Sequence, residues 1–146
     1  MRVLIVDDEP IVRESMSELL PWKEMGFETV LCARDAYDAQ KELELERIDV
    51  LISDIEMPGM DGLALSKWVH ERFPRTVILL LTCHASFSYA QSAIRYGVMD
   101  YLLKPVIKTD LEQCVQKAIR LIQEENKKIE TENEAYHWKK NKPYIM

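Results

Sequence analysis

Five short apolar runs lie along the chain, and segments with helical periodicity separate them. Each run is continuously apolar or nearly so, which is typical of parallel strands buried on both faces. The runs are residues 3–6, 29–31, 50–52, 77–81 and 101–103. The segments with helical spacing are residues 11–20, 36–47, 61–72, 86–96 and 109 onward. The pattern therefore predicts a strand followed by a helix, repeated five times.

This order predicts an α/β fold. Parallel strands joined by right-handed crossovers form a doubly wound five-stranded parallel sheet, (βα)5, with helices on both faces. In such sheets the ligand crevice lies beyond the carboxyl ends of the strands. The residues that follow each strand are therefore the first candidates for function.

Composition narrows the class of protein. The chain has 146 residues, 47% of them apolar, and no apolar run approaches the roughly 20 residues that span a bilayer. The N-terminus lacks the long apolar stretch of a signal peptide, so we expect a cytoplasmic protein without membrane contact. Cys32, Cys83 and Cys114 are an odd number without metal-ligand spacing, so we expect reduced thiols and neither a disulfide nor a zinc site.

The net charge of −6 lies entirely in residues 1–122, because residues 123–146 hold equal numbers of basic and acidic side chains. An acidic body repels a phosphate backbone, and nucleic-acid binding needs a basic face. We therefore expect no direct nucleic-acid binding by this chain. Its expected partners are proteins or cations.

Acidic, hydroxyl and basic side chains follow four of the five predicted strands. They are Asp7, Asp8, Asp54, Thr82 and Lys104. Three converging carboxylates repel one another unless a cation joins them, and Mg²⁺ prefers such oxygen ligands. The ion and Lys104 together balance the three negative charges. The strand ends therefore predict a magnesium site.

Each of these residues has a purely structural alternative. The Asp pair before Pro10 could cap the first helix, and Asp54 could belong to the turn at Met57–Gly59. Thr82 could satisfy backbone groups at a strand end, and Lys104 could be an ordinary surface lysine. Their occurrence at four separate strand ends favours one shared site.

Four motifs carry a family resemblance: Val-Leu-Ile-Val-Asp-Asp-Glu-Pro at 3–10, Leu-Ile-Ser-Asp-Ile-Glu-Met-Pro-Gly-Met-Asp-Gly at 51–62, Leu-Thr at 81–82 and Asp-Tyr-Leu-Leu-Lys-Pro at 100–105. Over residues 1–122 the chain resembles the receiver domain of bacterial two-component response regulators, which has a flavodoxin-like fold. In that family the matching residue to Asp54 accepts a phosphoryl group from a sensor histidine kinase. The family also has a cis peptide at the position of Lys104–Pro105.

The resemblance implies a role for each site residue. Asp7, Asp8, Asp54 and the backbone carbonyl of Glu56 correspond to the Mg²⁺ ligands. Lys104 corresponds to the residue that binds the phosphoryl group, and Thr82 and Tyr101 correspond to the switch pair. Such a protein is a phosphoacceptor with at most autocatalytic phosphotransfer and autodephosphorylation, and not an enzyme.

The segment 20–27, Leu-Pro-Trp-Lys-Glu-Met-Gly-Phe, resembles regulators that carry an AraC-type helix-turn-helix output domain for transcription regulation. No such output domain lies in this sequence. We expect residues 123–146 to form a linker helix with a disordered tail around Asn141–Pro143. The heptad pattern of this helix fades at Glu125 and Glu132, so we expect only a weak coiled coil. If Thr82 and Tyr101 move together on phosphorylation, we expect the faces around Ser92–Tyr96 and Leu111–Ala118 to become self-complementary and to form a homodimer.

One position departs from the family. Cys83 replaces the usual small residue after Thr82, and His84 follows it. In the family, the positions of Glu56 and His84 border the path of the hydrolytic water, so Glu56, Cys83 and His84 are expected to control access. A redox role for Cys83 and a metal-ligand role for His84 are weaker alternatives.

Two other function classes share part of this pattern. A haloacid-dehalogenase-type phosphatase also uses Mg²⁺ and an Asp nucleophile, but its acids form Asp-x-Asp after the first strand, whereas Asp7 and Asp8 are adjacent. A flavodoxin-type FMN binder has the same fold, but it needs a phosphate-binding loop there, and Asp7, Asp8 and Glu9 would repel a phosphate. Turnover of phosphate esters, or a yellow purified protein, would favour one of these classes.

Overall fold

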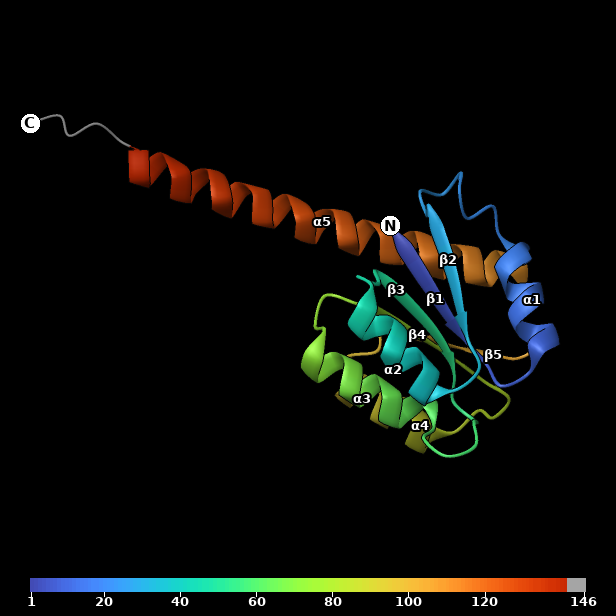
Figure 1. The fold of residues 1–146 in the computed structure, drawn as a ribbon. Coiled ribbons are helices and arrows are strands. Elements are labelled where there is room, and N and C mark those ends of the chain that lie inside the picture. Colours follow the sequence, from blue (N-terminus) through green and yellow to red (C-terminus); the bar gives the residue numbers. More distant parts are fainter. Residues whose placement is uncertain (142–146) are drawn as a thin grey trace, which may run out of the picture.

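The computed structural model describes residues 1–141 of the chain (Figure 1). The strands are β1 (Arg2–Val6), β2 (Thr29–Ala33), β3 (Val50–Asp54), β4 (Val77–Thr82) and β5 (Asp100–Leu103). The helices are α1 (Pro10–Leu19), α2 (Ala36–Leu45), α3 (Gly62–Arg72), α4 (Phe87–Arg95) and α5 (Lys108–Asn141). The predicted alternation is confirmed, and the ends of the elements differ from the prediction by no more than two residues.

The five strands form one parallel sheet in the order β2-β1-β3-β4-β5. Helices α1 and α5 cover one face of the sheet, and α2, α3 and α4 cover the other (Figure 1). The strand order changes direction between β1 and β3, which are neighbours in the sheet. The predicted doubly wound fold is therefore confirmed, and its crevice lies where β1 and β3 end.

Alternate residues of each central strand enter two separate cores. In β1, Val3 and Ile5 pack toward α1 and α5, whereas Leu4 and Val6 pack toward α2, α3 and α4. All four side chains are almost completely buried. This double burial explains why the strand is a continuous apolar run and not an alternating one.

The segment between α1 and β2 is anchored in the core on the α1 side. Trp22 and Phe27 are buried with their rings edge to face, and the Trp22 indole Nε1 donates to the Met16 carbonyl at 3.2 Å. Gly26 between them has φ +100°, a left-handed conformation that favours glycine. These contacts fix the position of α1 relative to β2.

Helix α5 covers the sheet with its first part and then continues past it (Figure 1). The side chains that face the sheet are Leu111, Val115, Ala118 and Ile122. The predicted boundary at residue 122 therefore follows the last of these buried side chains, although the division into 1–122 and 123–146 stays a prediction. Helix α5 includes Asn141, and the rest of the expected tail lies outside the described residues. Among residues 1–141, no helix combines the length and apolarity that crossing a bilayer requires.

Candidate functional site

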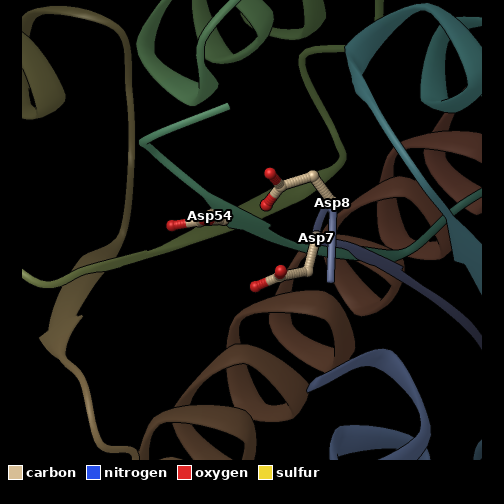
Figure 2. A group of neighbouring side chains, drawn as sticks. All are labelled: Asp7, Asp8 and Asp54. Carbon is tan, nitrogen blue, oxygen red and sulfur yellow. The ribbon is translucent and has the colours of Figure 1, made fainter. Parts of the chain in front are cut away.

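Three carboxylates gather at the carboxyl ends of β1 and β3 (Figure 2). Asp54 is the last residue of β3, and Asp7 and Asp8 directly follow β1. One oxygen from each carboxylate lies within 4.8 Å of the others. Asp7 and Asp54 are buried, whereas Asp8 is exposed. The structure thus brings together the three acids that the strand ends predict.

Lys104 follows β5 and joins two of these acids. Its Nζ lies 2.8 Å from Asp7 Oδ2 and 3.3 Å from Asp54 Oδ1. The Lys104 backbone N–H donates to the Thr82 carbonyl at 2.8 Å, and the Lys104–Pro105 peptide is cis, as expected. Burial opposes the charge on Lys104, but the Asp7 and Asp54 carboxylates outweigh it and raise the pKa of the ammonium.

The Lys104 ammonium does not fully compensate the negative charge of the Asp54 carboxylate. Burial raises its pKa to about 6, since the Asp7 charge adds to the effect and Lys104 only partly opposes it. Asp54 Oδ1 is buried and forms no hydrogen bond with any residue in the described range. A buried carboxylate oxygen that has only a 3.3 Å ion pair with Lys104 among the described residues, beside two further carboxylates, fits a hard divalent cation. The exposed Asp8 leaves one side of that position open to water.

The purely structural roles considered for these acids, helix capping and turn formation, account for part of the arrangement. Asp7 Oδ1 accepts a hydrogen bond from the Glu9 backbone N–H at 2.9 Å, just before Pro10 begins α1. The other Asp7 oxygen, however, binds Lys104. Gly59 has φ +79°, the value for the third residue of the type II turn expected at Met57–Gly59. Asp54 precedes this turn, and its carboxylate still lies in the acidic cluster.

The loop from β3 to α3 sets the position of Asp54. The Ile55 N–H donates to the Leu81 carbonyl at 2.8 Å, and the Gly62 N–H donates to the Ile55 carbonyl at 2.9 Å. A Cβ on Gly62 would lie 2.2 Å from the Asp54 carbonyl oxygen and 2.8 Å from Ile55 Cα. The start of α3 therefore packs directly on the Asp54 backbone, and only glycine leaves room for it. Sequence reasoning did not identify this role of Gly62.

Thr82 ends β4 and is completely buried beside the acidic cluster. Its hydroxyl donates to Glu56 Oε1 and accepts from the His84 backbone N–H at 3.0 Å. Burial raises the pKa of Glu56, but hydrogen bonds from the Thr82 hydroxyl and from backbone N–H groups outweigh it and lower the pKa overall. The contact between Thr82 and the Glu56 side chain was not predicted, because it depends on the path of the loop after Asp54.

The remaining predicted residues lie around this centre. The side chains of Cys83 and His84 are exposed. Tyr101 in β5 is half-buried and lines a cavity of about 220 Å³ with Ala90, Ala93, Ile94, Val98, Met99 and Asp100. Tyr101 thus lies between the sheet and α4, where a change in its ring position would alter the surface.

Comparison with known proteins agrees with this geometry. Residues 3–116 match the family described as the response regulator receiver domain. The transcriptional regulatory protein YesN of Bacillus subtilis is 31% identical over 118 residues, which are 81% of this chain and 32% of that protein. The chain spans from about a third to about half of the length of the curated relatives it matches.

Solved structures give the same result. The receiver domain of AraT from Geobacillus stearothermophilus is 41% identical, with a TM-score of 0.77 over 86% of this chain and 97% of that one. A two-component transcriptional regulator AraC from Clostridium phytofermentans is 25% identical, with a TM-score of 0.79 over 85% and 96% of the two chains. The family match, the fold and the structural neighbours agree, and the chain belongs to the response regulator receiver domains of two-component systems, with AraC-type regulators among its structural neighbours.

Proposed function

We propose that this domain accepts a phosphoryl group on Asp54 from a sensor histidine kinase. One observation carries the proposal: the Asp54 carboxylate lies beside two further carboxylates and 3.3 Å from the Lys104 ammonium. Phosphoryl transfer needs a nucleophile and positive charge near the phosphoryl oxygens, and the proposal assigns these roles to the Asp54 carboxylate and the Lys104 ammonium. The protein acts as a phosphoacceptor and not as an enzyme with an external substrate.

In the proposed reaction an Asp54 oxygen attacks the phosphorus of a phosphohistidine. The new P–O bond forms as the P–N bond breaks, and the leaving imidazole nitrogen takes up a proton. Lys104 Nζ, which lies 3.3 Å from Asp54 Oδ1, is placed to bind a phosphoryl oxygen as negative charge accumulates there. The contribution of the chain is therefore orientation and electrostatic stabilisation.

The acids fit Mg²⁺, and Asp7, Asp8, Asp54 and the Glu56 backbone carbonyl would hold it. When bound, Mg²⁺ supplies positive charge to the phosphoryl oxygens. Both Asp7 oxygens are held, one by the Glu9 backbone N–H at 2.9 Å and one by Lys104 at 2.8 Å, and Asp8 is exposed, whereas the buried Asp54 Oδ1 has a longer contact of 3.3 Å with Lys104. This difference favours Asp54 as the acceptor and the other two as ligands.

Phosphorylation replaces one carboxylate charge with a charge of about −2. We propose that the added charge attracts the Thr82 hydroxyl and that Tyr101 then changes its position beside α4. Glu56, Cys83 and His84 surround this hydroxyl and border the path of water to the phosphoryl group. The output of the switch is the face formed by α4, β5 and α5.

Relatives of this chain are transcriptional regulators, and the chain covers only part of their length. We propose that the switch controls a DNA-binding domain of the AraC type outside this sequence. The net charge of −6 disfavours nucleic-acid binding by the receiver itself, so we propose that its direct partners are the kinase and a second copy of the domain.

Incubation with acetyl phosphate and Mg²⁺ is expected to add one phosphoryl group, measured by intact mass spectrometry. Chelation of the metal and the substitution Asp54→Asn are each expected to abolish the added mass. Asp61→Asn is the matched control, because it makes the same chemical change at the residue that caps α3. A phosphorylated Asp54→Asn protein at the wild-type level would reject the proposal.

Beryllofluoride, a phosphoryl mimic, is expected to convert a monomer or weak dimer into a tighter dimer. Exposed apolar side chains on the output face, Ile94, Leu103 and Ile107, would be covered in a symmetric contact. Leu111, Val115 and Ala118 belong to the core, so only the outer side of this part of α5 is available. Sedimentation of wild type and Tyr101→Ala, with and without the mimic, measures the effect. Equal association in all four samples would contradict a self-association switch.

A further inference from the structure

The hydroxyl of Thr82 is already engaged when no phosphoryl group is present. It carries one proton, which it donates to Glu56 Oε1, and its oxygen also accepts from the His84 backbone N–H. Thr82 is completely buried, so water does not compete for this proton. The hydroxyl therefore cannot donate to a group on Asp54 until its bond to Glu56 breaks.

Apart from the Thr82 hydroxyl, the contacts that hold the Glu56 carboxylate come from backbone N–H groups. Its Oε2 is buried and has no hydrogen-bond partner within the described part of the chain. Lys104 forms its ion pairs with Asp7 and Asp54, and no ion pair is found between Glu56 and a described basic residue. The Thr82 hydroxyl is thus the side-chain donor that holds the carboxylate of the half-buried Glu56, and each of the two groups positions the other.

We propose that Glu56 is a positioning residue that holds the Thr82 hydroxyl in the resting state and opposes switching. The inference rests on the proposed function, because the competing acceptor is a phosphoryl group on Asp54. Added negative charge on Asp54 repels the Glu56 carboxylate and at the same time competes for the Thr82 proton. The Thr82 hydroxyl therefore exchanges one acceptor, the Glu56 carboxylate, for another, the phosphoryl group. Before phosphorylation, its bond to Glu56 lowers the population of the switched state.

The proposal predicts the affinity for beryllofluoride with Mg²⁺. Glu56→Ala removes the competing acceptor, so the mimic is expected to bind about tenfold more tightly, as for loss of one opposing hydrogen bond to a charged group. Glu56→Gln keeps an acceptor without the charge and is expected to lie between wild type and Glu56→Ala. Glu9→Gln is the control, because it removes an exposed acidic charge near the site without a contact to Thr82.

A double-mutant cycle separates positioning from charge. Thr82→Val removes the hydroxyl and keeps the shape of the side chain. In the Thr82→Val background, Glu56→Ala is expected to tighten binding clearly less than it does with Thr82 present, because only the charge repulsion remains and no hydroxyl is left for Glu56 to hold. Amide resonances of Thr82 and Tyr101 give a second readout: in Glu56→Ala without the mimic, they are expected to shift toward their positions in the beryllofluoride-bound wild type.

Each outcome has one meaning. Larger tightening with Thr82 present than in the Thr82→Val background, together with the resonance shifts, supports the proposal. Equal tightening in both backgrounds would show that Glu56 acts only through its charge, and no tightening in either background would show that it does not oppose switching. Both results would overturn the inference and leave the proposed function intact. Failure of the wild type itself to bind the mimic would instead reject the proposed function.

Discussion

Gly62→Ala is expected to lower the free energy of unfolding by about 3 kcal/mol, because the added methyl group overlaps backbone and not a flexible side chain. The new Cβ would lie 2.2 Å from the Asp54 carbonyl oxygen and 2.8 Å from Ile55 Cα. Relief of this overlap requires α3 to move away from the end of β3, which also weakens the hydrogen bond from the Gly62 N–H to Ile55. Urea unfolding, followed by circular dichroism, measures the loss.

Gly59→Ala in the same loop is the control for this substitution. Gly59 has φ +79°, and its added Cβ would lie 3.3 Å from the ring of Tyr37, a side chain that can move. The expected cost is about 1 kcal/mol, from the left-handed backbone alone. A loss in Gly62→Ala no larger than in Gly59→Ala would contradict the close packing of α3 on the Asp54 backbone.

Asp54→Asn is expected to raise the free energy of unfolding of the metal-free protein by about 3 kcal/mol at pH 7. Burial raises the pKa of Asp54 to about 6 from its ordinary value of 3.8. An acid with a raised pKa destabilises the fold when it is ionised. This cost is fully present above about pH 6 and is lost as the pH falls toward 3.8, so the advantage of Asp54→Asn should disappear there.

Magnesium is expected to narrow the difference in stability between the two proteins. At about ten times its Kd, Mg²⁺ should stabilise the wild type by about 1.4 kcal/mol, and Asp54→Asn by less because it lacks one ligand charge. Chemical unfolding in EDTA and in Mg²⁺ measures both effects, with Asp61→Asn as the control for loss of one carboxylate. A less stable Asp54→Asn protein in EDTA would show that the Asp54 charge is well compensated without metal.

The fold could be predicted because both faces of the central strands are buried. Leu51 and Ile52 in β3 are adjacent, point to opposite faces and are both fully buried, so the sequence shows a continuous run. At the sheet edges the same rule is weaker, since Cys32 in β2 and Leu103 in β5 are exposed. The predicted order of elements depended on the central strands, where the continuous apolar runs are clearest.

The acidic cluster could be predicted because parallel strands end at one edge of the sheet. Asp7, Asp54 and Lys104 are distant in sequence, but each lies at or just after a strand end, and the topology brings them together. The contact between Glu56 and Thr82 could not be predicted in this way. It depends on the backbone path after Asp54, which is set by the hydrogen bonds of Ile55 and by the space at Gly62.

The chemical identity of the phosphorylated residue tests the central claim most directly. An aspartyl phosphate is an acyl phosphate, and borohydride reduces it to homoserine at the residue that carried it. Protein treated with acetyl phosphate and Mg²⁺ would be reduced, digested and mapped by peptide mass spectrometry. The account predicts homoserine at position 54 and aspartate retained at positions 7, 8 and 61. Homoserine at Asp7 or Asp8, or a labelled protein with unmodified Asp54, would contradict it.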